Sequence, residues 1–121
     1  MEIFTLPALL RRNALRLGDK KVAIREKEFG IWQSVTWKGY YENVRDFALG
    51  LHQLGFRRDD KLSYIGDNRP EGLYSELAAQ TLGGAIVGIY PDSHLDQVEY
   101  ITKHSDSVFV IFLSMDDFSC A

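Results

Sequence analysis

Two polar turns are the best candidates for a ligand site in this 121-residue sequence. Gly66-Asp67-Asn68-Arg69-Pro70 and Tyr90-Pro91-Asp92-Ser93 each follow a short apolar run typical of a strand. Ligands of parallel α/β sheets tend to bind at the carboxyl ends of the strands, where these turns would offer carboxylate, amide, guanidinium and hydroxyl groups. The pattern therefore predicts that both turns line one rim.

Each turn also has an ordinary structural interpretation. The side-chain oxygen of Asp67 or Asn68 can cap the helix that follows, and we favour that role because the sequence shows no partner group for a site. Ser93, with Asp96 three residues later, forms a weak variant of the capping box. The sequence therefore assigns no catalytic, cofactor-binding or metal-binding residue.

Gly83, Gly84 and Gly88 do not have the arrangement of a phosphate-binding loop. Such a loop follows a strand and opens a helix, because the backbone N–H groups at a helix N-terminus bind the phosphate. These glycines follow a predicted helix and open a strand, so we predict a structural role. The adjacent acidic pairs Asp59-Asp60 and Asp116-Asp117 lie in predicted loops and are expected to be solvated charges.

The composition is that of an ordinary soluble globular domain, with 45% hydrophobic and 26% charged residues. The formal charge of -3 and the pI near 5.5 argue against nucleic acid and against strongly electrostatic attachment to anionic lipid. The single cysteine, Cys120, and the three histidines provide neither an internal disulfide nor a zinc-ligand spacing. We expect a cytoplasmic protein without a transmembrane segment.

Local signals place a helix and a hairpin at the start of the chain. Thr5 is a suitable N-cap, with proline two residues later, and Gly18 ends the helix. Residues 22–25 and 31–36 have the character of strands, with a turn within 27–30, which predicts a hairpin at a sheet edge.

The next helix has the clearest pattern in the sequence. Thr36 is its predicted N-cap, Gly55 occupies the position of a left-handed C-terminal cap, and Phe56 can fold back on the helix end. The apolar positions at offsets 0, 4, 7, 8, 11 and 14 trace one helical face: Tyr40, Val44, Phe47, Ala48, Leu51 and Leu54. We expect Trp32, Trp37 and Tyr41 to pack in the core or at its edge.

The remaining residues alternate between strands and helices. We predict strands at 61–65, 85–90 and 108–112, with helices at about 71–82 and 93–104. Leu73, Leu77, Ala78 and Leu82 should form the apolar side of the first of these helices. The run 85–90 is apolar enough for a strand covered on both faces. This order predicts right-handed crossovers and a parallel sheet.

Several separated stretches resemble the opening of AMP-forming long-chain acyl-CoA synthetases of the adenylate-forming ligase superfamily. They are Val35-Thr36-Trp37, Ala48-Leu49-Gly50-Leu51-His52-Gln53-Leu54-Gly55, Gly66-Asp67-Asn68-Arg69-Pro70-Glu71 and the stretches 76–85, 88–93 and 98–106. Gly72 is a departure, since the long-chain branch commonly has tryptophan there. The resemblance covers residues 4–111, and 112–121 form a divergent tail, which suggests a truncated or frame-shifted gene.

This resemblance implies a two-step reaction. A fatty carboxylate attacks the α-phosphate of ATP to give acyl-AMP and pyrophosphate, and the CoA thiol then displaces AMP, with Mg²⁺ screening the triphosphate. In the family, the phosphate loop, the adenine and ribose contacts and the catalytic lysine lie beyond the matching region. ATP, Mg²⁺ and CoA are therefore expected for the full-length enzyme, and none is expected to be bound by these 121 residues.

The sequence thus predicts an incomplete α/β domain, with a partial parallel sheet, flanking helices and an N-terminal edge hairpin. The function it implies is the N-terminal fragment of a long-chain fatty-acid–CoA ligase, inactive in isolation. A stand-alone, non-catalytic interaction module derived from the ligase fold is the alternative. In either case we expect self-association through an exposed sheet edge.

Overall fold

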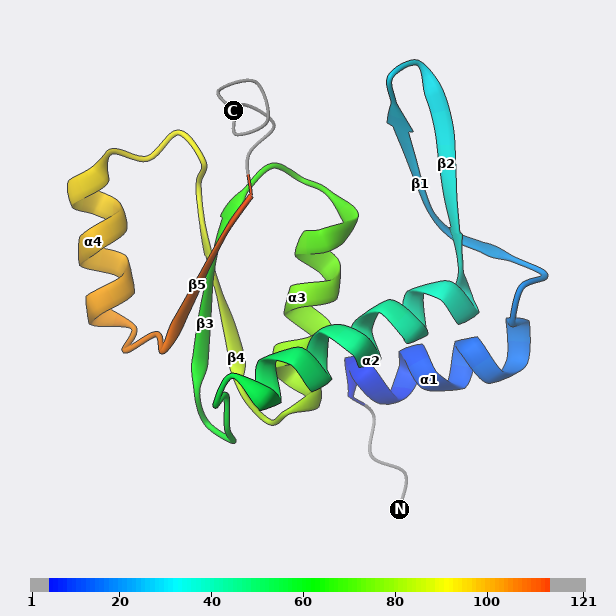
Figure 1. The fold of residues 1–121 in the computed structure, drawn as a ribbon, viewed down its shortest axis with the longest axis horizontal. Coiled ribbons are helices and arrows are strands. Elements are labelled where there is room, and N and C mark those ends of the chain that lie inside the picture. The colour runs from blue at the N-terminus through cyan, green and yellow to red at the C-terminus, as the bar shows by residue number, and fades with distance from the viewer. Residues whose placement is uncertain (1–4, 114–121) are drawn as a thin grey trace.

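The computed structural model describes residues 5–113, which form two small sheets and a set of helices (Figure 1). The elements in chain order are α1 (Leu6–Leu17), β1 (Val22–Glu28), β2 (Ile31–Thr36), α2 (Trp37–Gln53), β3 (Lys61–Gly66), α3 (Pro70–Thr81), β4 (Ala85–Ile89), α4 (Leu95–His104) and β5 (Phe109–Leu113). No helix within residues 5–113 has both the length and the apolarity needed to cross a bilayer.

Strand β3 lies at the centre of a parallel three-stranded sheet with the order β4-β3-β5. This confirms the predicted alternation of strands and helices. Leu62 and Ser63 of β3 are fully buried. The prediction that residues 85–90 are covered on both faces is wrong, because β4 is an edge strand of the described sheet and Ile89 is its single buried residue.

Helix α3 packs on the sheet and against α1 and α2, whereas α4 lies on the opposite side of the sheet (Figure 1). The core at these contacts includes Tyr74, Leu77 and Ala78. Leu73, predicted on the same side, is 38% exposed, because the packed face of α3 is centred on Tyr74 and Ala78. Leu82 is partly buried against the core, as predicted.

Helix α2 begins and ends at the predicted residues. Thr36 Oγ1 accepts a hydrogen bond from the Gly39 amide at 3.1 Å. At the other end, Gly55 has a φ of 109°, and the Phe56 amide donates to the Leu51 carbonyl at 3.0 Å, so the fully buried Phe56 folds back on the helix. Leu54 is 70% exposed rather than packed, because it is the C-cap residue and lies beyond the helical face.

The first helix and the hairpin also form, with one difference in placement. Thr5 caps α1 and Gly18 ends it, as predicted. Strands β1 and β2 pair antiparallel as a separate two-stranded sheet that projects from the helices (Figure 1). They do not join an edge of the parallel sheet. Thr36 is both the last residue of β2 and the N-cap of α2, so no linker between them lets the hairpin reach that sheet.

Two further predictions need correction. Helix α4 begins at Leu95 with His94 as N-cap, and the Gln97 side chain accepts from the His94 amide at 3.4 Å, so Ser93 is not the cap. Trp37 and Tyr41 pack against the core as predicted, but Trp32 is 64% exposed because the projecting hairpin carries it away from the helices.

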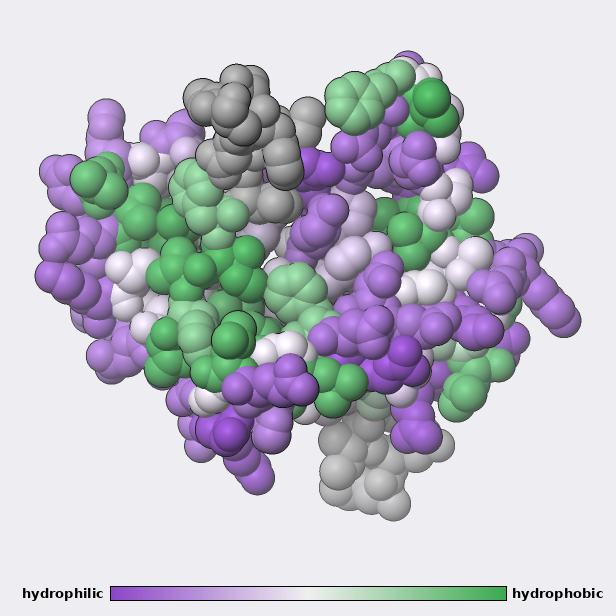
Figure 2. All heavy atoms as spheres, viewed as in Figure 1, coloured by the Kyte–Doolittle hydropathy of each residue, from purple (hydrophilic) through white to green (hydrophobic). Residues whose placement is uncertain are grey.

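Apolar side chains gather over β5 and α4 in Figure 2. Val110 and Phe112 of β5 are about half exposed or more, and Tyr100 of α4 is 65% exposed. Self-association through this exposed edge of the sheet stays a prediction.

Gly84 tests the packing where α3 meets β4. A Cβ added there would overlap the Asp60 carbonyl oxygen and lie 2.6 Å from the Phe56 ring. Gly84→Ala should therefore lower the free energy of unfolding by about 2–3 kcal/mol. Gly50→Ala is the matched control: its Cβ would meet open space on α2, and the change should stabilise by about 0.5–1 kcal/mol. Urea unfolding measures both, and equal effects at the two positions would contradict this packing.

Candidate functional site

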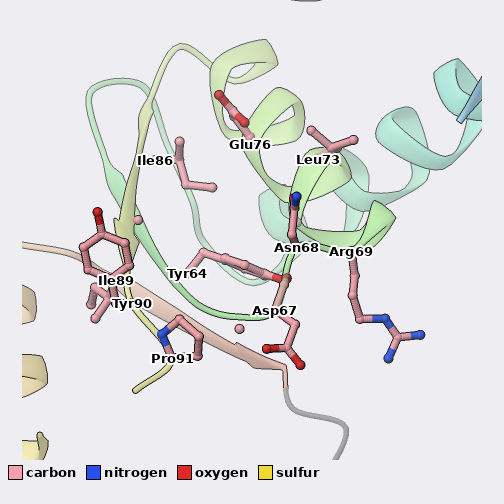
Figure 3. A pocket seen from close by; sticks show the side chains of 13 residues that line it. Tyr64, Asp67, Asn68, Arg69, Leu73, Glu76, Ile86, Ile89, Tyr90 and Pro91 are labelled. Carbon is pink, nitrogen blue, oxygen red and sulfur yellow. The ribbon is translucent and has the colours of Figure 1, made fainter. Parts of the chain in front are cut away.

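An open groove of about 640 Å³ lies at the carboxyl ends of β3 and β4, between these strands and α3 (Figure 3). Thirteen residues line it: Tyr64, Gly66, Asp67, Asn68, Arg69, Gly72, Leu73, Glu76, Ile86, Gly88, Ile89, Tyr90 and Pro91. The parallel register pairs Tyr64 with Gly88 and Ile65 with Ile89, so the turns after β3 and β4 emerge at the same end of the sheet. The prediction that they share a rim is confirmed.

Asp67 and Asn68 do not cap α3, which corrects the role we favoured for them. The N-cap is Arg69, without a side-chain cap bond, because Pro70 occupies the first turn and places the helix start one residue later. Asp67 and Asn68 instead line the groove.

Tyr64 closes part of the groove by lying against α3. Atoms of its phenol lie 3.0 to 3.2 Å from the position that a Cβ on Gly72 would occupy, so a larger residue at 72 would displace the ring by a few tenths of an ångström. The hydroxyl donates a hydrogen bond to the Asp67 carbonyl oxygen at 3.0 Å. Burial, followed by the charge of Glu71, raises the pKa of Tyr64, so the phenol stays protonated to a higher pH than an exposed tyrosine does.

Arg69 connects the rim of the groove to the hairpin. Its Nη2 atom lies 3.3 Å from Glu26 Oε1 and 3.6 Å from Glu28 Oε1 of β1, and its Nε lies 3.7 Å from Glu71 Oε2. The Arg69 side chain is only 15% exposed. Glu26 Oε2 and Glu71 Oε2 are buried without a hydrogen-bond partner among residues 5–113. One guanidinium thus lies within ion-pair distance of three carboxylates.

The groove does not fit a magnesium triphosphate. Its charged side chains are Asp67, Arg69 and Glu76, and Arg69 is engaged by glutamates. A triphosphate needs concentrated positive charge or a cradle of amides. Residues 5–113 also contain no cluster of three or more histidine, cysteine or acidic side chains suited to a metal. The groove is better suited to an uncharged ligand, which could form hydrogen bonds there and contact the apolar side chains of Leu73, Ile86 and Pro91.

The other residues singled out by the sequence have mostly structural roles. Gly83 has a φ of 81° and Gly84 is closely packed, as predicted, whereas Gly88 lines the groove and has open space around it. Asp60 Oδ2 accepts from the Arg57 amide at 2.7 Å, so that carboxylate stabilises a turn. Asp116, Asp117 and Cys120 lie outside the described residues.

Sequence reasoning missed Tyr64, Gly72 and Glu76 as neighbours in the groove. Gly72 and Glu76 are four residues apart on α3 and so share a helical face, a signal that was available. The contact between Tyr64 and Gly72 had no such signal, because it depends on how α3 packs on β3.

The chain is an α/β protein, with a parallel sheet and an open groove at the carboxyl ends of its strands. The same fold occurs in the N-terminal subdomain of Klebsiella oxytoca NpsA, with a TM-score of 0.81 at 16% identity, over 91% of this chain and 27% of that one. Because the identity is low, this similarity shows the fold alone.

Sequence comparison then identifies the family. Residues 10–120 match the AMP-binding enzyme family, and the chain belongs to it. The chain is 42% identical over 105 residues to 4-hydroxybutyrate–CoA ligase 2 of Metallosphaera sedula, and 27% identical over 107 residues to the long-chain-fatty-acid–CoA ligase ACSBG2 of Xenopus laevis. These alignments cover 87% and 88% of this chain but only 18% and 14% of the two ligases.

Replacing Arg69 tests the ion cluster at the rim. Arg69→Gln would remove the cation that Glu26 and Glu71 share, whose side chains are 23% and 45% exposed, and should lower the free energy of unfolding by about 1–2 kcal/mol. Arg45→Gln removes an exposed partner of Asp46 and should change it by less than about 0.5 kcal/mol. If urea unfolding gives the same value for both variants, Arg69 does not hold the hairpin to the rim.

Proposed function

We propose that this chain forms the N-terminal part of an acid–CoA ligase that activates a carboxylic acid with ATP and transfers the acyl group to CoA. The observation that carries the proposal is the 42% identity over 87% of the chain to a protein named as a CoA ligase. Membership of the AMP-binding enzyme family supports the same reaction class. A stand-alone interaction module is not favoured, because the curated relatives reported above are both named as ligases.

For the acid, our first candidate is a long-chain fatty acid, in line with the resemblance of residues 66–71 to the long-chain branch and with the Xenopus laevis relative. The higher identity to 4-hydroxybutyrate–CoA ligase 2 favours a second candidate, a short hydroxy acid. Gly72 weighs against the long-chain candidate, because tryptophan commonly occupies that position in the long-chain branch.

The role we propose for residues 1–121 is structural. Their groove does not fit a triphosphate, and its described residues do not pair a nucleophile with a base. ATP, Mg²⁺ and CoA would then be held by other residues of the complete ligase. On this proposal the 121-residue chain alone does not catalyse acid-dependent pyrophosphate exchange.

A chimera tests this role directly. The matching segment of the Metallosphaera sedula ligase is replaced by this chain, and acid-dependent pyrophosphate exchange is measured. We expect activity within about tenfold of the parent, a difference of about 1.4 kcal/mol in the barrier, and none from the 121-residue chain alone. A chimera carrying Leu62→Asp, which places a charge at a fully buried position of β3, is the inactive control.

Two results would contradict the proposal: exchange by the isolated chain, or a soluble, folded chimera without activity. The choice between the two acids needs the complete ligase that carries this segment. A higher kcat/KM for palmitate than for 4-hydroxybutyrate supports the long-chain candidate, and the reverse order supports the short hydroxy acid.

A further inference from the structure

The tip of the β1–β2 hairpin presents apolar side chains to solvent. Phe29 is 90% exposed, Ile31 63% and Trp32 64%. Figure 2 shows apolar side chains at the end of the projecting hairpin, away from the helices. Three large apolar residues grouped at one protruding turn are unlike the single exposed apolar residues that any surface carries.

The backbone conformation of this turn disfavours phenylalanine at position 29. Phe29 and Gly30 form a two-residue turn with φ values of 52° and 77°. Turns with positive φ at both positions favour Asn-Gly or Asp-Gly, because a bulky side chain is disfavoured in the left-handed region. The Phe29 side chain packs too little to offset this strain, so the fold gives no reason for an aromatic residue here.

Charges on the hairpin are sorted between its two faces. Glu26 and Glu28 point to the face held by Arg69, at 3.3 and 3.6 Å. Arg25 and Lys27 alternate with them along β1 and are exposed on the other face. Lys27 is the cross-strand partner of Trp32, and its Nζ lies 5.9 Å from the centre of the Trp32 ring. The outward face is therefore cationic and aromatic.

From this arrangement we infer that the hairpin tip docks on an anionic phospholipid bilayer. Phe29 at the turn and Trp32 on the outward face enter the boundary between headgroups and acyl chains, where aromatic side chains concentrate, whereas Ile31 pairs with Glu28 on the opposite face. Arg25 and Lys27 then face the lipid phosphates. The net charge of -3 opposes attachment through the whole surface, so the contact is confined to the tip and depends mainly on apolar insertion. The inference does not rest on the proposed ligase function.

A bilayer fits this surface better than a second copy of the chain. A stable protein interface buries roughly 800 Å² on each partner. A single narrow turn with three apolar side chains provides much less than that. Shallow insertion into a bilayer needs only these side chains and a nearby positive charge.

Co-sedimentation of the 121-residue chain with vesicles tests the inference. The probes are phosphatidylcholine vesicles with and without phosphatidylserine, and we expect stronger partition when phosphatidylserine is present. Phe29→Asn should weaken partition about tenfold through the loss of one inserted aromatic side chain. The same variant should raise the melting temperature, because asparagine suits the turn.

Leu15→Asn is the matched control, since Leu15 is a 78% exposed apolar residue on α1, away from the tip. It should leave partition unchanged. The inference is overturned if the chain binds neither vesicle, if Leu15→Asn weakens partition as much as Phe29→Asn, or if the tip instead mediates self-association without lipid.

Discussion

The burial of β3 between its two parallel neighbours is the constraint on which the rest of this structure depends. Leu62 and Ser63 are fully buried, and the Ser63 hydroxyl is satisfied by Ser107 at an Oγ–Oγ distance of 2.6 Å. Strands β4 and β5 flank β3 on its two sides, so the crossover after β3 and the crossover after β4 run in opposite directions. Because such crossovers are right-handed, α3 and α4 lie on opposite faces of the sheet (Figure 1). The groove follows from the same arrangement, since parallel strands bring their carboxyl-end turns to one rim.

Two different kinds of interaction then connect the rim to the remainder of the chain. Tyr64 lies against Gly72 and positions the turn through its bond to the Asp67 carbonyl. Arg69 reaches from the same turn to the glutamates of β1, so an ion cluster joins the hairpin to the rim, while Ile24 of β1 packs against the core. This contact lies in the half of the hairpin next to its tip, since Glu28 pairs with Ile31 directly beside the turn. The chain spans less than a fifth of the length of the two ligases with which it was compared.

Local signals in the sequence were sufficient for most of the fold. The hydroxyls of Thr5 and Thr36 and the glycine at 55 determine helix ends within a few residues, and these predictions are confirmed. Predictions failed where tertiary packing decides the outcome, as in the exposure of β4 and Leu73 and the separate position of the hairpin. The shared rim of the groove followed from strand order alone. The pairing of Arg69 with Glu26 joins residues 43 apart, and no local pattern contains it.

Native-state hydrogen exchange tests the central position of β3 most directly. Amides in the middle of β3, at Leu62 to Ile65, should exchange only through global unfolding, with an opening free energy equal to that from urea unfolding. Amides of α4, which has no buried residue, should open at a lower free energy. If the β3 amides exchange as readily as those of α4, the strand is not the buried centre of the sheet and this account of the fold is wrong.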